Sequence, residues 1–259
     1  GNPGRYMQIL VGDTIYFSAD GSTGDELWAH DTSNHSTWQV ADINSGSSGS
    51  TPGYKMKILL GDTIYFDAYS LNNGRELWAH DISNHSTWRV VDIYTGSIGS
   101  DPGEEMALLV GETLYFSAND GNTGTELWAH DTSNHSTWQV ADLRASGSFP
   151  GQYMSLLIGD TLYFSATDGS TGYELWAHDT SNHSTWQVAD IKSGSSGSAP
   201  GQYMALLIGD TLYFTANDGS TGYELWAHRP SRIDYNTNTG GTVTSWAINN
   251  TNLPSGLTF

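Results

Sequence analysis

One motif, Glu-Leu-Trp-Ala-His, occurs five times in this chain of 259 residues. Its tryptophans are Trp28, Trp78, Trp128, Trp176 and Trp226, so successive copies lie 50, 50, 48 and 50 residues apart. A proline and a methionine recur at nearly the same step, and Ser-Asn-His-Ser-Thr-Trp is repeated unchanged in four copies. A period of this length predicts a repeat architecture in which each copy is one structural unit.

Each copy contains four segments with the composition of β-strands, separated by turn residues. In the fourth copy these segments are residues 154–158, 161–166, 174–178 and 185–191. Gly159-Asp160 between the first two predicts a tight hairpin, and the Asp-Gly-Ser-Thr-Gly run after the second predicts a longer turn. Because no segment shows helical periodicity, the chain is predicted to be all-β.

Several of these segments are apolar on both faces, such as Leu156-Leu157-Ile158 and Leu162-Tyr163-Phe164. An antiparallel sheet with two apolar faces must be covered on both sides, and neighbouring copies provide that cover when they stack. Radial stacking predicts a five-bladed β-propeller, with four antiparallel strands and about 50 residues per blade. A linear β-solenoid is the alternative architecture.

The predicted blades are residues 1–50, 51–100, 101–148, 149–198 and 199–248, and the repeat motif itself covers residues 1–228. In the last copy the pattern breaks after His228, where Arg229-Pro230 replaces Asp-Thr. Residues 242–248, which include Trp246, resemble the usual fourth strand, and we expect them to complete the fifth blade. The tail, residues 249–259, resembles the start of an immunoglobulin-like module.

The recurring Gly-Asp-Thr-Leu-Tyr-Phe, followed by Glu-Leu-Trp and then Asp-Ile, resembles the ELWxxDGT-type repeats of large microbial surface and secreted proteins. The chain departs from that pattern at its final Asp-Gly-Thr, where it has Ala29-His30-Asp31-Thr32. The order of strands and loops is also similar to that of kelch propellers. The resemblance implies an extracellular or cell-surface module without catalytic activity, and it implies no particular ligand.

The charge balance narrows the choice of partners. Nine Lys and Arg stand against 28 Asp and Glu, a net charge of −19. Nucleic acids and anionic membranes repel such a chain, so we expect neither nucleic-acid binding nor membrane insertion. Cysteine is absent, which excludes disulfides and thiolate metal sites. The chain begins Gly-Asn-Pro-Gly, and we expect it to be part of a longer multidomain protein.

Acidic residues recur at fixed repeat positions, where turn capping and solubility account for most of them. The alternative is calcium at the Asp-Gly loops, because calcium prefers carboxylate and carbonyl oxygens. The candidate calcium ligands are Asp20, Asp120, Asp168 and Asp218. Histidine pairs such as His30 and His35 are interpreted as packed or hydrogen-bonded groups rather than zinc ligands, and no other metal or cofactor is expected.

Two further sets of residues recur with the repeat. One is a second set of tryptophans, predicted to pack between blades or to serve as stacking platforms for sugars. These candidate ligand-binding residues are Trp38, Trp88, Trp138 and Trp186. The other is a set of N-glycosylation patterns in predicted surface turns, which begin at Asn34, Asn84, Asn134, Asn182 and, in the tail, Asn249.

These features predict an extracellular or cell-surface β-propeller module for adhesion, scaffolding or surface-layer structure, with glycans or neighbouring surface proteins as partners. The alternative is a carbohydrate-binding lectin with about five equivalent sites, whose avidity would come from repetition. A glycoside hydrolase is the third alternative. It requires carboxylates in different environments, whereas near-identical blades repeat one carboxylate in similar surroundings. We therefore predict no catalytic residues and no enzymatic activity.

Overall fold

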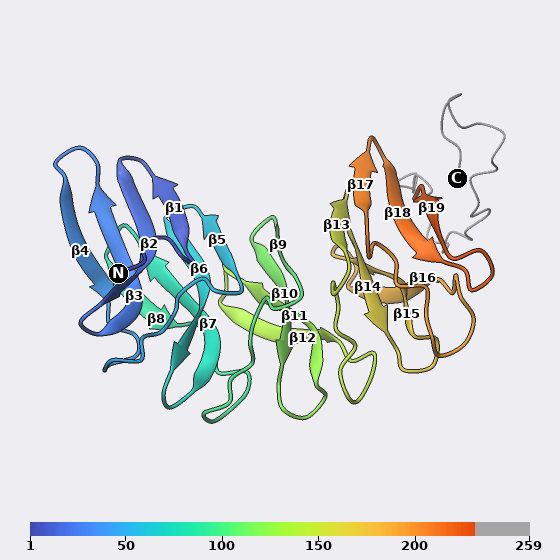
Figure 1. Cartoon of the computed structure of the whole chain (residues 1–259), viewed down its shortest axis with the longest axis horizontal. Coiled ribbons are helices and arrows are strands. Elements are labelled where there is room, and N and C mark those ends of the chain that lie inside the picture. Colours follow the sequence, from blue (N-terminus) through green and yellow to red (C-terminus); the bar gives the residue numbers. More distant parts are fainter. Residues whose placement is uncertain (231–259) are drawn as a thin grey trace. The chain divides into compact units, whose positions relative to one another are not determined.

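The computed structural model describes residues 1–230, which form nineteen β-strands and no helix (Figure 1). The chain divides into two compact units, Gly1–Ser148 and Phe149–Phe259, called unit 1 and unit 2 below. The strand predicted over residues 242–248, the tail 249–259 and Asn249 lie outside the described residues.

Unit 1 contains three four-stranded antiparallel sheets in which each strand pairs with the next along the chain. Their strands are β1 (Gln8–Val11), β2 (Thr14–Gly21), β3 (Gly24–Asp31) and β4 (Ser36–Ala41); β5 (Lys57–Leu60), β6 (Thr63–Ser70), β7 (Gly74–Asp81) and β8 (Ser86–Arg89); and β9 (Ala107–Val110), β10 (Thr113–Asn119), β11 (Thr125–Asp131) and β12 (Ser136–Ala141).

Unit 2 contains a fourth sheet of the same order and a fifth sheet that has three strands within the described residues. Their strands are β13 (Ser155–Ile158), β14 (Thr161–Thr167), β15 (Tyr173–Asp179) and β16 (Ser184–Ala189), then β17 (Ala205–Ile208), β18 (Thr211–Asn217) and β19 (Tyr223–His228). Together with the structural likenesses given below, the five successive sheets confirm the predicted all-β, five-bladed propeller fold.

The core lies between consecutive sheets, as the apolar character of both faces predicts. In unit 1, Met7, Leu27 and Ala29 of the first blade pack against Phe66 and its neighbours in the second. The second and third sheets form an equivalent cluster, in which Leu77 and Ala79 meet Leu114 and Phe116. Within unit 2, Leu175 and Ala177 meet Leu212 and Phe214. Burial of these side chains on one sheet therefore depends on the presence of the next sheet.

The glycine- and serine-rich linkers between sheets also pack closely. Gly74, at the start of β7, has a φ of 67°, and a Cβ at this position would lie 2.2 Å from the backbone nitrogen of Gly99. Gly24 and Gly124 make the same approach to linker glycines in their sheets. Only glycine allows this proximity of two backbones. In the first four blades the linker is therefore fixed against the start of the third strand.

Candidate functional site

Most of the chain is repeated closely, but the five copies differ most at one end of the strands of each sheet, which is called the edge below. At this edge the first strand begins, the second strand ends and the third strand begins. The variable residues are the dipeptides Arg5-Tyr6, Tyr54-Lys55, Glu104-Glu105, Gln152-Tyr153 and Gln202-Tyr203, and the third-strand residues Asp25, Arg75, Thr125, Tyr173 and Tyr223. We call these residues the variable edge. Residues that diverge on a repeated scaffold are candidates for specific recognition.

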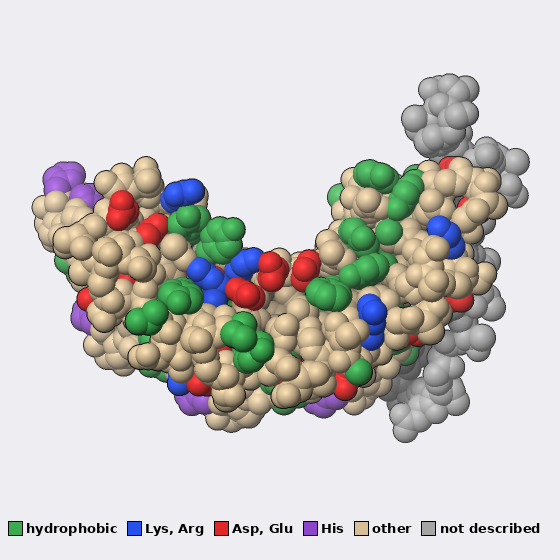
Figure 2. Space-filling view, turned by 60° about the horizontal axis from the view of Figure 1, so that its bottom comes forward, with side chains coloured by type: hydrophobic (Ala, Val, Ile, Leu, Met, Phe, Trp, Pro, Cys, Tyr) green, Lys and Arg blue, Asp and Glu red, His purple; other side chains and the backbone are tan. Residues whose placement is uncertain are grey.

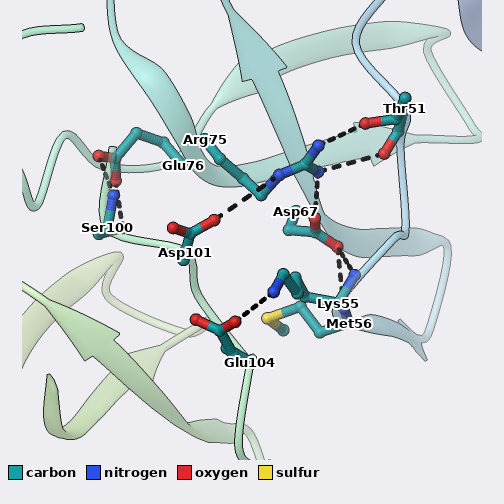
Figure 3. A network of polar contacts seen from close by, with 9 residues as sticks. All are labelled: Thr51, Lys55, Met56, Asp67, Arg75, Glu76, Ser100, Asp101 and Glu104. Atoms are coloured by element: carbon teal, nitrogen blue, oxygen red, sulfur yellow. Dashed lines mark hydrogen bonds and ion pairs between the residues drawn. The ribbon is translucent and has the colours of Figure 1, made fainter. Parts of the chain in front are cut away.

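A buried ion pair distinguishes the second blade at this edge (Figure 3). The Asp67 carboxylate accepts hydrogen bonds from the backbone N–H groups of Lys55 and Met56, both at 2.8 Å, and from the guanidinium of Arg75. Arg75 also donates to the backbone and side-chain oxygens of Thr51. The Asp67 side chain is fully buried and that of Arg75 is 13% exposed. Burial raises the pKa of Asp67, while Arg75 and the two N–H groups oppose the rise.

The other copies have a hydroxyl where the second has Asp67. In the first copy, Ser18 Oγ accepts the N–H groups of Tyr6 and Met7 at 3.0 and 3.2 Å. The same hydroxyl bonds occur at Ser117, Ser165 and Thr215. One carboxylate oxygen of the second copy thus replaces the hydroxyl, and the other is free to pair with Arg75. The two substitutions belong together.

Four of the nine basic residues of the chain lie at or beside the variable edge of unit 1, namely Arg5, Lys55, Lys57 and Arg75. Lys55 Nζ pairs with Glu104 of the third blade at 2.5 Å, and Lys57 Nζ donates to the Tyr6 carbonyl at 2.7 Å. Basic and acidic side chains gather beside hydrophobic ones on the face of unit 1 seen in Figure 2. These contacts tie each blade of unit 1 to the next.

Aromatic side chains complete this edge of unit 1. The rings of Tyr6 and Tyr54 meet edge to face with centroids 5.2 Å apart. Lys55 and Arg75 lie 5.2 and 5.3 Å from the centroid of the Tyr54 ring, within range of cation–π attraction. Tyr54 nevertheless remains 54% exposed. This edge of unit 1 therefore presents an accessible aromatic ring beside Lys55 and Arg75, which are paired with acidic side chains.

The variable edge of unit 2 is uncharged and built from tyrosines. Tyr153 meets Tyr173 edge to face at 5.1 Å, and Tyr203 meets Tyr223 at 4.8 Å. The Tyr223 hydroxyl donates to Gln202 Oε1. Burial, and then the neighbouring Tyr203 and Tyr153, raise the pKa of Tyr223. We call Tyr153, Tyr173, Tyr203 and Tyr223 the tyrosine cluster.

A set of buried glutamates, which sequence reasoning assigned to capping and solubility, secures the linkers. Glu76 has no exposed surface and accepts hydrogen bonds from Ser100 Oγ at 2.6 Å, Ser100 N at 2.9 Å and the backbone N–H groups of Ile93 and Tyr94. Burial, opposed by these hydrogen bonds, raises the pKa of Glu76 to about 7. The same bond to a linker serine recurs at Glu26, Glu126 and Glu174. The sequence signal was the recurrence of Gly-Ser 24 residues after the glutamate of Glu-Leu-Trp in the first, second and fourth copies, and 22 residues after it in the third.

In the second and third copies, the first histidine of the pair belongs to a blade interface. His80 is fully buried, its Nδ1 lies 2.8 Å from Thr87 Oγ1, and its ring contacts Tyr16 of the preceding blade. His130 makes the same contacts with Thr137 and Tyr65. Desolvation lowers the pKa of both imidazoles to about 4. The packed and hydrogen-bonded role predicted for these histidines agrees with this geometry.

The tryptophans predicted to bind ligands lie singly on the outermost strand of four different sheets, at Trp38, Trp88, Trp138 and Trp186. Trp38 and Trp186 are 37% and 38% exposed, whereas Trp88 packs partly against the core between the second and third sheets. The structure does not bring them together within either unit, and their role in binding remains a prediction.

The aspartates predicted to bind calcium bond mainly within their own loops. Asp168 accepts hydrogen bonds from the backbone and side chains of Ser170 and Thr171. Slight burial opposes these bonds, but together they lower the pKa of Asp168 to about 2. Asp120 and Asp218 form equivalent turns. Asp20 instead lies in a shorter hairpin, where its backbone is the strand partner of Asp25. Within residues 1–230, no group of three or more His, Asp and Glu is arranged to hold a metal ion. Calcium binding remains a prediction.

The predicted glycosylation sites of the described residues occupy the turns between the third and fourth strands. In the first copy, Asn34 is exposed, its Nδ2 donates to Asp31 at 2.8 Å, and its Oδ1 accepts the N–H of Ser36 at 2.9 Å. His35 follows with a φ of 61°. The same turn recurs at Asn84, Asn134 and Asn182. These asparagines are accessible, and their modification remains a prediction.

Comparison with known proteins finds similarity in fold to solved structures. No family model matches this chain. No curated protein matches it either. Among solved structures, it is similar to a puromycin hydrolase mutant complexed with PGG, at 12% identity and a TM-score of 0.50, with 85% of this chain and 35% of that chain covered. It is also similar to a structure from a study of two prolyl endopeptidases, at 13% identity and a TM-score of 0.53, with 90% and 35% covered.

These likenesses correct one prediction. The chain was predicted to lack enzymatic activity, yet the two solved structures just named, a puromycin hydrolase and one from the prolyl endopeptidase study, are of enzymes. A repeated scaffold of near-identical blades is compatible with a place in an enzyme, so the prediction of no enzymatic activity was wrong. The chain spans about a third of the length of these proteins, 35% in each case. At this identity the likeness shows the fold alone.

The part of the chain that the structure describes contains no helical segment that could span a membrane.

Proposed function

We propose that this chain is an extracellular or cell-surface adhesion module that binds its ligand at the variable edge. The observation that carries the proposal is the contrast between a closely repeated scaffold and a concentrated divergence of aromatic and charged side chains at this edge. Tyr54 and Tyr203 are 54% and 69% exposed there. The resemblance to repeats of microbial surface proteins supports the proposed location.

Adhesion requires side chains that offer contact area without a large loss of conformational freedom. Tyrosine meets this requirement, because its rigid ring has an apolar body and a polar tip. The edge-to-face partners of these rings limit their motion further. Glycans and neighbouring surface proteins are the ligands proposed for this edge, and several weak contacts would add up through multivalency.

The proposal is tested with the full chain, labelled and applied to an array of surface polysaccharides and purified surface glycoproteins. Replacing both Arg5-Tyr6 and Tyr54-Lys55 with Glu-Glu, the dipeptide of the third copy, should weaken ligands held by unit 1 at least tenfold. Arg89→Gln, which removes a positive charge from β8 and matches Gln39 of the first copy, is the control and should leave binding unchanged. No binding by the wild-type chain to any probe on the array would refute the adhesion function.

The half-exposed indoles of Trp38 and Trp186 favour a second candidate, the lectin with a site on each blade. In that case Trp186→Gln would reduce the number of ligand molecules bound per chain, whereas substitutions at the variable edge would leave it unchanged.

A further inference from the structure

We infer that the tyrosine cluster of unit 2 is a binding site for a neutral pyranose sugar. The inference rests on the proposed adhesion function and assigns a ligand class to one part of its surface. It follows from three features of the cluster: the ring geometry, the absence of charge among its side chains and the repetition of the same residues in two blades.

The ring geometry leaves aromatic surface accessible. Tyr203 is 69% exposed and Tyr223 is 38% exposed, although their rings meet at 4.8 Å with an interplanar angle of 80°. An edge-to-face pair holds both rings at fixed orientations. A pyranose has a flat face of C–H groups, and an exposed, pre-oriented ring covers such a face at little entropic cost.

The polar groups of the cluster suit hydroxyls better than ions. The Tyr223 hydroxyl bonds to Gln202 Oε1, which leaves the exposed Gln202 amide nitrogen as a donor for a sugar oxygen. A tyrosine hydroxyl is neutral at physiological pH, and burial raises the pKa of Tyr223 further. The cluster and its two glutamines contain no charged side chain, whereas an acidic sugar would require a basic partner. A neutral sugar is therefore the ligand class that matches.

The repetition predicts a polymer rather than a single sugar. The fourth blade has Gln152, Tyr153 and Tyr173, and the fifth has the same residue types at the equivalent positions. Both tyrosine pairs have the same edge-to-face arrangement, at 5.1 and 4.8 Å. Two equivalent subsites in consecutive blades would hold two residues of one chain, and the second contact would raise the affinity through effective concentration.

Isothermal titration of the full chain with soluble neutral polysaccharides (a β-glucan, a mannan and a galactan) tests the inference, and polygalacturonate serves as the charged arm. We expect at least one neutral polymer to bind. Tyr203→Ala, at the most exposed ring, should weaken this binding at least tenfold. The double variant Tyr203→Glu/Tyr223→Thr carries the residue types of Glu105 and Thr125, which the same backbone accommodates in the third blade. It should abolish binding, with an unchanged circular dichroism spectrum and Tm.

Trp186→Gln is the matched aromatic control and should bind the neutral polymer as the wild type does. Neutral-polymer binding that survives both tyrosine variants, or that is lost in Trp186→Gln, would overturn the inference and leave the adhesion function standing. Binding of polygalacturonate alone would overturn it in the same way. A chain that binds neither these polymers nor any probe on the array would instead overturn the adhesion function itself.

Discussion

The ion pair between Asp67 and Arg75 provides a quantitative test of how this fold accommodates differences between its copies. Replacing Arg75 with Thr, the residue of the third copy, leaves a fully buried carboxylate without its cation. Removing one partner of a buried pair costs about 3–5 kcal/mol. Because Asp67 keeps two backbone N–H donors at 2.8 Å, we expect the low end of this range, about 3 kcal/mol. Such a loss corresponds to a decrease in Tm of roughly 6–12 °C.

Substitution of the other partner, Asp67, is expected to cost less stability. In Asp67→Ser, the hydroxyl takes over the bonds to the Lys55 and Met56 N–H groups, as Ser117 does for its own blade at 2.9 and 3.3 Å. Arg75 keeps its bonds to Thr51 and its ion pair with Asp101. We therefore expect this variant to lose about 1 kcal/mol. The double variant reproduces the pair of the third copy and should also lie within about 1 kcal/mol of the wild type.

Urea denaturation at pH 7.5, followed by tryptophan fluorescence and analysed as a double-mutant cycle, gives the coupling energy between the two positions. The expected coupling is about 3 kcal/mol. The m-value should stay constant, because the same surface becomes exposed on unfolding in all four proteins. The reasoning is wrong if Arg75→Thr is as stable as the wild type, or if the second substitution fails to recover the stability lost by the first.

Three further predictions concern buried groups. The lowered pKa of His80, about 4 against 6.5 when unfolded, means that its contribution to stability falls as the pH drops from 6.5 towards 4. His80→Asn should lose about 2 kcal/mol less than the wild type between pH 7.5 and 5, and equal losses in urea titrations would contradict this. The contribution of Glu76 to stability depends on pH in the opposite direction. Its pKa is raised from 4.5 to about 7, so this contribution is lost as the pH rises through 7. The free energy of unfolding of the wild type should therefore fall by about 2 kcal/mol more than that of Glu76→Gln between pH 5 and 8, and parallel pH curves would argue against burial as the cause. Gly74→Ala should cost more than about 2 kcal/mol in thermal unfolding, since its Cβ would meet the Gly99 backbone, whereas Gly61→Ala, with φ of 56° and open space around it, should cost about 1 kcal/mol. Similar Tm values for the two glycine variants would count against the close approach.

The candidate site was only partly visible in the sequence. The divergent dipeptides before the first strands can be read directly, but nothing in the linear order connects Tyr203 with Tyr223 or Asp67 with Arg75. One hairpin separates Asp67 from Arg75, and two separate Tyr203 from Tyr223; the register of these hairpins decides which side chains lie together. The sequence drew attention to the Trp38 and Asp120 sets because these residues recur regularly, whereas the variable edge is marked by departure from the repeat.

The repeat period and the apolar segments by themselves determined the all-β class, the number of blades and the strands of the first four blades, because stacked sheets must cover both faces and these copies repeat the same solution. The buried roles of Glu76 and His80 depended on the tertiary structure, since the sequence does not distinguish a glutamate or histidine that faces water from one that faces a neighbouring blade. Packing supplies the donors, the desolvation and the adjacent rings that decide what such a group does, and these partners come from distant parts of the chain.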